Sequence, residues 1–203
     1  MTADGLPALV VILALFCMWH AWTALGPRLA AAFLVIAIAV SWALEEIGVA
    51  TGLVYGPYHY TATLGPSIGA VPVLIPLAWF ALAYPTSVLV DLVAGRWAGG
   101  AAGGLPRLIG LAAAGALLMT AWDLALDPIL SGPAYRAWVW AADGPAGGTA
   151  GGIPAQNYVG WFATAFTIFL ASRLVQRRVS GTAPQRVREL GAPAVTAPAP
   201  ARP

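Results

Sequence analysis

The stretch LAAAFLVIAIAVSWALEEIGVATG, residues 29–52, joins an apolar run of membrane-spanning length to two adjacent glutamates. A helix needs about 20 mostly apolar residues to cross a hydrocarbon layer of about 30 Å. Residues 29–47 meet this condition, and Glu45 and Glu46 interrupt the run only near its end. A carboxylate near hydrocarbon is costly unless it is hydrated, paired or protonated. The rest of the chain must therefore provide a special environment for these two acids.

The whole chain has the composition of a polytopic membrane protein. Of its 203 residues, 60% are hydrophobic and only 9% are charged. Apolar segments of spanning length lie near residues 6–25, 29–47, 72–93, 108–126 and 159–175. The first segment lacks the features of a cleaved signal peptide, so it is expected to remain as a span. The sequence predicts an all-α transmembrane bundle of about five spans with outer loops rich in Gly, Pro and aromatic residues; a sixth crossing within those loops would change the count.

The arginines predict a topology. All ten basic residues are Arg, and with the N-terminus outside only Arg136 falls on the outer side. The other nine lie inside, which is a strong positive-inside bias. They are Arg28, Arg96, Arg107, Arg173, Arg177, Arg178, Arg186, Arg188 and Arg202. We therefore expect a protein of the bacterial cytoplasmic membrane with its C-terminus inside, and no nucleic-acid partner. Residues 1–178 form the predicted transmembrane domain, and residues 179–203 form a disordered Ala/Pro-rich cytoplasmic tail.

Acidic residues meet at the predicted outer face. The fourth span ends in TAWDLALDP, residues 120–128, where Asp123 and Asp127 are four residues apart and share one helix face. Pro128 is expected to end that helix. The second span ends at Glu45 and Glu46, of which only one need face the bundle. The candidate catalytic residues are therefore Glu45, Glu46, Asp123 and Asp127.

These acids have a simpler interpretation as solvated helix ends at the membrane interface. Asp91, expected beside Arg96, and Asp143, in a Gly-rich loop, fit that description. The four clustered acids fit it less well, because no Lys or Arg lies near them in sequence. Carboxyl groups that share an apolar setting cannot all be ionised, so a proton donor and a proton acceptor would lie side by side. Acid–base chemistry needs this arrangement.

Aromatic residues supply candidate substrate contacts, and metal ligands are not apparent. Most of the nine Trp are expected to anchor the protein at the interface. Trp42 and Trp122 are adjacent to the acids, where an indole face could stabilise a positive charge. Cys17 and the two histidines, His20 and His59, do not have metal-binding spacing. We expect the histidines to be hydrogen-bonded structural groups, and we expect no metal or cofactor.

Four motifs occur in a characteristic order: EEIGVATGLVYGPYHYT (residues 45–61), VPVLIPLAW (71–79), TAWDLALDP (120–128) and GIPAQNYVGW (152–161). Over residues 41–162 they resemble the integral-membrane carotenoid biosynthesis family, which includes hydratases of acyclic carotenoid end groups. The resemblance implies addition of water to the terminal double bond of such a carotenoid, giving a tertiary alcohol without a redox cofactor. The positions that fall on the family motifs are Glu45, Glu46, Tyr58, Asp123, Asp127, Asn157 and Trp161. The candidate substrate-binding residues are Trp42, Tyr58, Trp122, Asn157 and Trp161.

The chain departs from the family after its last motif, where longer members continue with further spans. Part of the substrate groove is therefore expected either to be missing or to be supplied by a partner. The expected partners are the carotenoid substrate, membrane lipid, and a second copy of the chain or another carotenoid enzyme. A cyclase, in which an internal alkene captures the cation, remains an alternative, as does a non-catalytic carotenoid-binding or assembly subunit. A transporter is disfavoured, because the first and fifth spans offer few polar residues at mid-bilayer.

Overall fold

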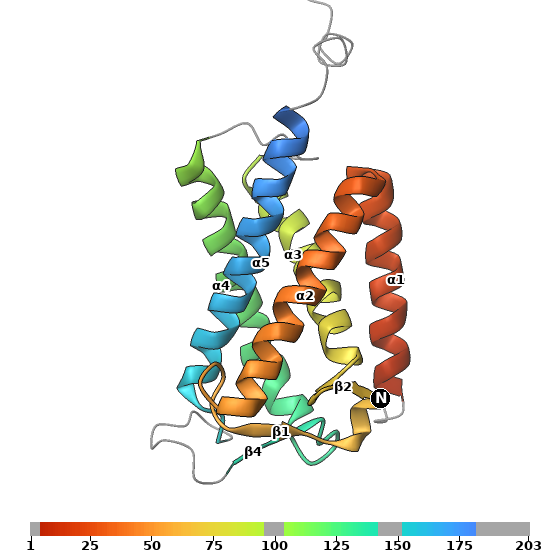
Figure 1. The fold of residues 1–203 in the computed structure, drawn as a ribbon, viewed down its shortest axis with the longest axis vertical. Helices are drawn as coiled ribbons and strands as arrows, with labels where there is room; N and C mark the ends of the chain where they lie inside the picture. The colour runs from red at the N-terminus through yellow and green to blue at the C-terminus, as the bar shows by residue number, and fades with distance from the viewer. Residues whose placement is uncertain (1–4, 96–103, 142–151, 182–203) are drawn as a thin grey trace, which may run out of the picture.

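Five long helices form the protein in the computed structural model, which describes residues 5–95, 104–141 and 152–181 (Figure 1). All five are long and apolar enough to cross a membrane. They are α1 (Leu6–Leu25), α2 (Pro27–Thr51), α3 (Leu74–Val93), α4 (Leu105–Leu130) and α5 (Ala155–Gly181). The predicted all-α transmembrane bundle is therefore confirmed, and the described residues contain no sixth span. The protein is an integral membrane protein.

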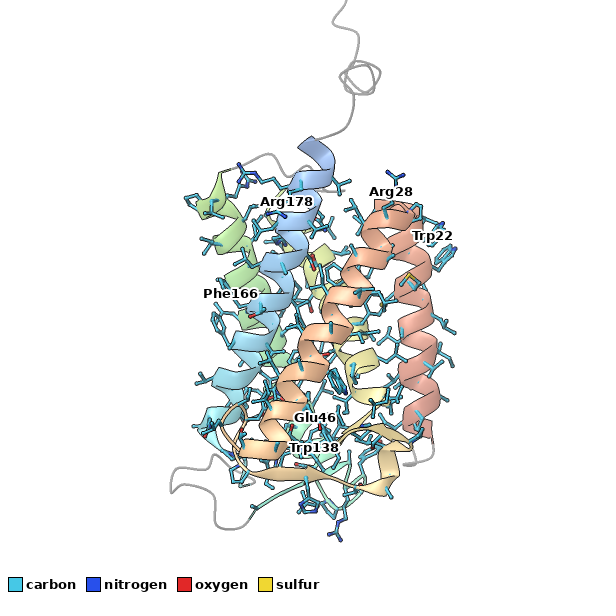
Figure 2. All side chains as sticks on the ribbon, in the orientation of Figure 1. Trp22, Arg28, Glu46, Trp138, Phe166 and Arg178 are labelled. Carbon is cyan, nitrogen blue, oxygen red and sulfur yellow. The ribbon has the colours of Figure 1, made fainter. Side chains whose placement is uncertain are left out.

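The helices run alternately up and down, so the bundle has two different ends (Figure 1). The start of α1 and the segments that follow α2 and α4 lie at one end, which we call the loop end. The α1–α2 turn, the start of α4 and the end of α5 lie at the other, which we call the arginine end. Arg28 and Arg178 lie at the arginine end, whereas Glu46 and Trp138 lie at the loop end (Figure 2). The sequence predicted this separation; which end faces the cytoplasm stays a prediction.

Several helices extend beyond their predicted limits. Pro128 does not end α4, which continues to Leu130. A proline this close to a helix end removes only one backbone hydrogen bond, and the Ser131 N–H and hydroxyl both donate to the Asp127 carbonyl at 2.9 and 2.7 Å. Helix α5 reaches Gly181, so residues 179–181 belong to the bundle. The rest of the predicted tail lies outside the described residues.

Helix α3 occupies the middle of the bundle. It packs against α1 and α2, while α5 packs against α2 and α4. Phe33 of α2 meets Tyr84 of α3 edge-on, with ring centroids 5.7 Å apart, a geometry favoured for aromatic pairs. Helix α1 is peripheral, and Trp19 and Trp22 expose 62% and 56% of their surface. In a membrane those side chains would contact lipid.

Short strands join the two long loops at the loop end, where the sequence predicted only irregular structure. Strand β1 (Tyr58–Tyr60) pairs antiparallel with β4 (Trp138–Trp140), with Tyr58 opposite Trp140 and Tyr60 opposite Trp138. Successive strand residues point to opposite faces, so the two tyrosines and the two tryptophans share one face. A second pair, β2 (Ser67–Ile68) and β3 (Val71–Pro72), forms a hairpin after the short 3-10 turn Ala62–Leu64.

Tyr55 fixes the loop that follows α2 onto the helices. Its ring lies where a Cβ on Gly48 of α2 would be 2.8 Å away and one on Gly160 of α5 would be 2.6 Å away. Only glycine leaves room for the ring at these two positions. The Tyr55 hydroxyl and the Thr164 hydroxyl are hydrogen-bonded at 2.8 Å. The loop is thus held against both helices, which places β1 over the end of the bundle.

Candidate active site

A cavity of about 90 Å³ lies at the loop end among α2, α3, α4, α5 and the β1–β4 pair. Glu45 from α2 and Asp123 and Asp127 from α4 all line it. Each of these three acids exposes 5% of its surface or less. The structure therefore brings together three of the four acids that the sequence singled out. Their burial excludes the interpretation of solvated helix ends.

Glu45 accepts hydrogen bonds from three side chains. The hydroxyls of Tyr58 and Tyr60 donate to Oε2, the latter at 2.7 Å, and the Trp79 indole N–H donates to Oε1 at 2.9 Å. Burial, followed by the nearby Glu45 charge, raises the pKa of both Tyr58 and Tyr60. Both phenols therefore stay protonated and remain donors. A carboxyl group with three donors is stabilised in its ionised form.

The two aspartates of α4 share one partner on α5. The Asn157 amide N–H group donates to Asp123 Oδ2 at 2.6 Å and to Asp127 Oδ2 at 2.9 Å. Asp127 Oδ1 also accepts from the indoles of Trp138 and Trp140, at 2.9 and 3.2 Å. Asp127 thus has three donors, like Glu45. Asn157 fixes the relative position of the two aspartates because one amide nitrogen serves both.

Asp123 differs from the other two acids in its hydrogen bonds. Asn157 is its only hydrogen-bond donor among the described residues, and Asp123 Oδ1 has no partner there. No arginine from the described part of the chain lines the cavity to compensate the acids. Three ionised carboxylates in so apolar a space would repel strongly. The proton that relieves this repulsion fits best on Asp123, which has the fewest donors and a free oxygen to carry it.

The remaining walls of the cavity are apolar and largely aromatic. Trp79 and Trp161 stack with ring centroids 4.2 Å apart. The aliphatic part of the lining comes from α3 and α4 and consists of Ile75, Ala78, Leu82, Leu126 and Leu130. An electron-rich ring face can stabilise a cation that forms beside it. Among the described residues, no group of His, Cys, Asp and Glu is placed to hold a metal ion.

Three predicted site residues do not line the cavity. Glu46 points away from the cavity, and its carboxylate accepts the Ala70 N–H of the β2–β3 hairpin at 3.0 and 3.2 Å. It does so because it is about 100° around α2 from Glu45. The Trp42 indole donates to the Ile68 carbonyl at 3.1 Å and lines a separate apolar groove. Trp122 is 45% exposed on the surface of α4.

Asp91 also differs from its prediction as a solvated group beside Arg96. It forms an ion pair with Arg173 of α5, with Arg173 Nη1 and Asp91 Oδ1 2.8 Å apart. Arg173 was predicted only to lie on the inner side of the membrane, and the structure buries it to 3% exposure. Arg96 and Asp143 lie outside the described residues. His20 is a hydrogen-bonded structural group, as expected, because its Nδ1 lies 2.7 Å from the Tyr84 hydroxyl.

Four aromatic residues that contact the acids were not predicted to do so. These are Tyr60, Trp79, Trp138 and Trp140. For Tyr60, Trp138 and Trp140 the sequence contained a strand signal, because aromatic residues alternate in YHY, residues 58–60, and in WVW, residues 138–140. Such alternation is typical of a strand with one buried face. The pairing of two loops far apart in sequence was needed to show what that face covers.

Comparisons with known proteins agree with the motifs. A family model described as "Carotenoid biosynthesis protein" matches residues 5–197. Bisanhydrobacterioruberin hydratase from Haloarcula japonica is 35% identical over 122 residues, which is 60% of this chain and 37% of the relative. The aligned region thus spans little more than a third of the relative's length. No solved structure is significantly similar to the chain.

Proposed function

The chain belongs to the carotenoid biosynthesis protein family, and from this membership we propose that it adds water to the terminal double bond of an acyclic carotenoid. The substrate is a lipid-soluble isoprenoid that reaches the cavity from the bilayer. The similarity to a protein named as a hydratase supports this reaction type. The topology proposed from the arginines places the cavity at the outer face of the cytoplasmic membrane.

One observation carries the proposal: three buried carboxyl groups surround one small aromatic cavity, and their hydrogen-bond donors are unevenly distributed. Glu45 and Asp127 each accept from three donors, whereas Asp123 accepts from one. This distribution supports one protonated and two ionised acids. Such a set supplies both a general acid and a general base within a single site.

In the first step Asp123 donates its proton to the terminal alkene. The proton bonds to the less substituted carbon of the double bond, and a tertiary carbocation forms at the other carbon. Asp123 is left as a carboxylate. The cation lies in the cavity beside the stacked rings of Trp79 and Trp161 and near ionised Asp127, all of which favour positive charge. Asn157 positions Asp123 for this transfer.

In the second step a water oxygen attacks the cation and forms the carbon–oxygen bond of a tertiary alcohol. Glu45 accepts the proton that the water loses. Glu45 comes from α2, whereas both aspartates come from α4. The proton then returns to Asp123 through water, so the enzyme is regenerated and one water molecule is added overall. No electrons are transferred, so the step needs no redox cofactor.

The size of the cavity favours hydration over cyclisation. Its volume of about 90 Å³ is smaller than the engineered cavity of about 150 Å³ that binds benzene. One branched five-carbon end group fits this space better than two isoprene units folded toward a six-membered ring. A non-catalytic carotenoid-binding role would not require three buried acids, whose burial is costly.

The test compares amide variants of the acids in cells that accumulate an acyclic carotenoid. Loss of a general acid or base typically lowers the rate about 10²–10⁴-fold, so Asp123→Asn and Glu45→Gln should abolish the product heavier by one water. Glu46→Gln is the matched control, since Glu46 lies outside the cavity, and it should keep near wild-type product at equal protein level. An active Asp123→Asn variant would exclude the proposed acid. A wild-type product of unchanged mass would indicate cyclisation, and no product would indicate a binding role.

A further inference from the structure

Arg173 has an unused hydrogen-bonding edge inside the bundle. Among the described residues, Ser172 and Arg173 carry fully enclosed side-chain nitrogen or oxygen atoms that have no hydrogen-bond partner. Arg173 is only 3% exposed, and its Nη1 donates to Asp91 Oδ1 at 2.8 Å. Its Nε and Nη2 have no partner. Buried donors of a charged group are costly to leave unpaired, so this edge calls for an acceptor.

The shape of the edge indicates the kind of acceptor. Nε and Nη2 of a guanidinium present two parallel N–H bonds, which match two oxygens of one carboxylate or phosphate. A single water or carbonyl oxygen would serve this pair less well. Asp91 fixes the orientation of the guanidinium through Nη1 and leaves the other edge free. Arg173 thus supplies the two donors of a bidentate oxyanion site, and the oxyanion itself would come from a ligand.

The depth of Arg173 indicates a phosphate. Arg173 lies 16 residues after Asn157 on α5, or about 24 Å along the helix axis. The catalytic cavity lies at the loop end, so Arg173 lies toward the opposite edge of a hydrocarbon layer of about 30 Å. Asp91 is in the last turn of α3, near the same edge. At that depth the abundant anion with two available oxygens is the phosphate of a lipid headgroup.

Other cations at this end favour the approach of an anion. Arg177 and Arg178 follow in the next turn of α5 and are exposed, and exposed Arg107 lies in the first turn of α4. Basic residues near a membrane surface attract anionic lipids. They also offset the charge of Asp91, which would otherwise oppose an anion at Arg173.

We propose that Arg173 and Asp91 form a phosphate-binding site at the arginine end of the bundle. The Nε–Nη2 edge of Arg173 binds two phosphate oxygens, and Asp91 positions the guanidinium. The phosphate comes from a lipid headgroup or from free inorganic phosphate. The site is separate from the acid cavity, so its test is independent of the proposed hydration.

The test uses the purified full-length protein in phosphate-free maltoside micelles and measures its unfolding temperature. One titration adds phosphatidylglycerol, a second adds diacylglycerol with the same acyl chains, and a third adds inorganic phosphate at ionic strength held constant with chloride. A ligand that binds the folded state raises the unfolding temperature in a saturable manner. A rise with phosphatidylglycerol but not diacylglycerol supports a lipid source, and a rise with inorganic phosphate supports a site open to free phosphate. No saturable rise with either phosphate, or an equal rise with diacylglycerol, would overturn the proposal.

The matched variants are Arg173→Lys and Arg177→Lys, which both keep the positive charge. Lysine at position 173 can still pair with Asp91 but lacks the planar edge, so phosphate should bind about tenfold more weakly or worse. Arg177→Lys should bind within about threefold of wild type, because surface cations act mainly through charge. Equal binding by wild type and Arg173→Lys would overturn the assignment. The wild-type titrations decide the question even if Arg173→Lys does not fold.

Discussion

Removal of the Tyr60 hydroxyl tests whether Glu45 is ionised in the resting protein. Tyr60→Phe deletes one oxygen, which donates to Glu45 Oε2 at 2.7 Å. A hydrogen bond to a charged group contributes about 1.5–3 kcal/mol to stability, whereas one between neutral groups contributes about 0.5–1.5 kcal/mol. Tyr84→Phe is the matched control, because the Tyr84 hydroxyl lies 2.7 Å from His20 Nδ1, away from the cavity. The free energy of unfolding should fall about 1 kcal/mol or more further in Tyr60→Phe than in Tyr84→Phe.

The same change should slow hydration. Loss of a donor disfavours ionised Glu45, so the shared proton moves from Asp123 toward Glu45 and fewer molecules have the reactive arrangement. A change of about 1.4 kcal/mol corresponds to a factor of about ten, so Tyr60→Phe should lower the rate roughly tenfold or more. Tyr84→Phe should leave it nearly unchanged. Unfolding in mixed micelles and product formation at equal protein level measure the two effects. Equal losses of stability in both variants, with full activity in Tyr60→Phe, would refute the ionised state of Glu45.

Three further changes test the scaffold and the topology. Gly69→Ala should lower the free energy of unfolding by about 1 kcal/mol more than Gly65→Ala. Both residues have positive φ, but only at Gly69 would an added Cβ lie 2.6 Å from the Glu46 carboxylate and displace it from the Ala70 N–H; thermal unfolding in micelles measures the difference. Gly160→Ala should destabilise the protein and lower activity, because the added Cβ would lie 2.5 Å from the Val54 carbonyl oxygen in the loop after α2. Unchanged activity would contradict the close packing of this loop against α5. Cysteines that replace Thr63 and Arg177 should react with an impermeant reagent from outside and inside the cell, respectively, and labelling of both from one side would exclude the five-span topology.

The fold was predictable because its main signals are local. Span length and apolar composition placed five helices, with errors of a few residues at their ends. The Pro128 error shows the limit of such rules: proline disfavours a helical residue before it, yet α4 keeps one more turn past Asp127. That turn is kept where Ser131 caps the Asp127 carbonyl, which a spacing rule does not include. Helix ends depend on such contacts more than helix interiors do.

The candidate site was only partly predictable, because its contacts are long-range. Helical spacing placed Asp123 and Asp127 on one face, and the family motifs singled out Asn157. Which of Glu45 and Glu46 faces the cavity depends on how α2 is rotated within the bundle. The sequence around the two glutamates does not show this rotation. Tyr58, Tyr60, Trp138 and Trp140 reach the acids through the β1–β4 pairing, between segments about 80 residues apart in sequence. No local pattern identifies such a partner.

The fate of a labelled water oxygen tests the central claim most directly. Cells that make an acyclic carotenoid and express the wild-type chain are grown in isotopically labelled water, and the carotenoids are analysed by mass spectrometry. The account predicts a product heavier by one water, with the labelled oxygen in a tertiary alcohol on the end group, and no such product with Asp123→Asn at equal protein level. An isomer of unchanged mass, or labelled alcohol formed equally by the Asp123→Asn variant, would contradict it.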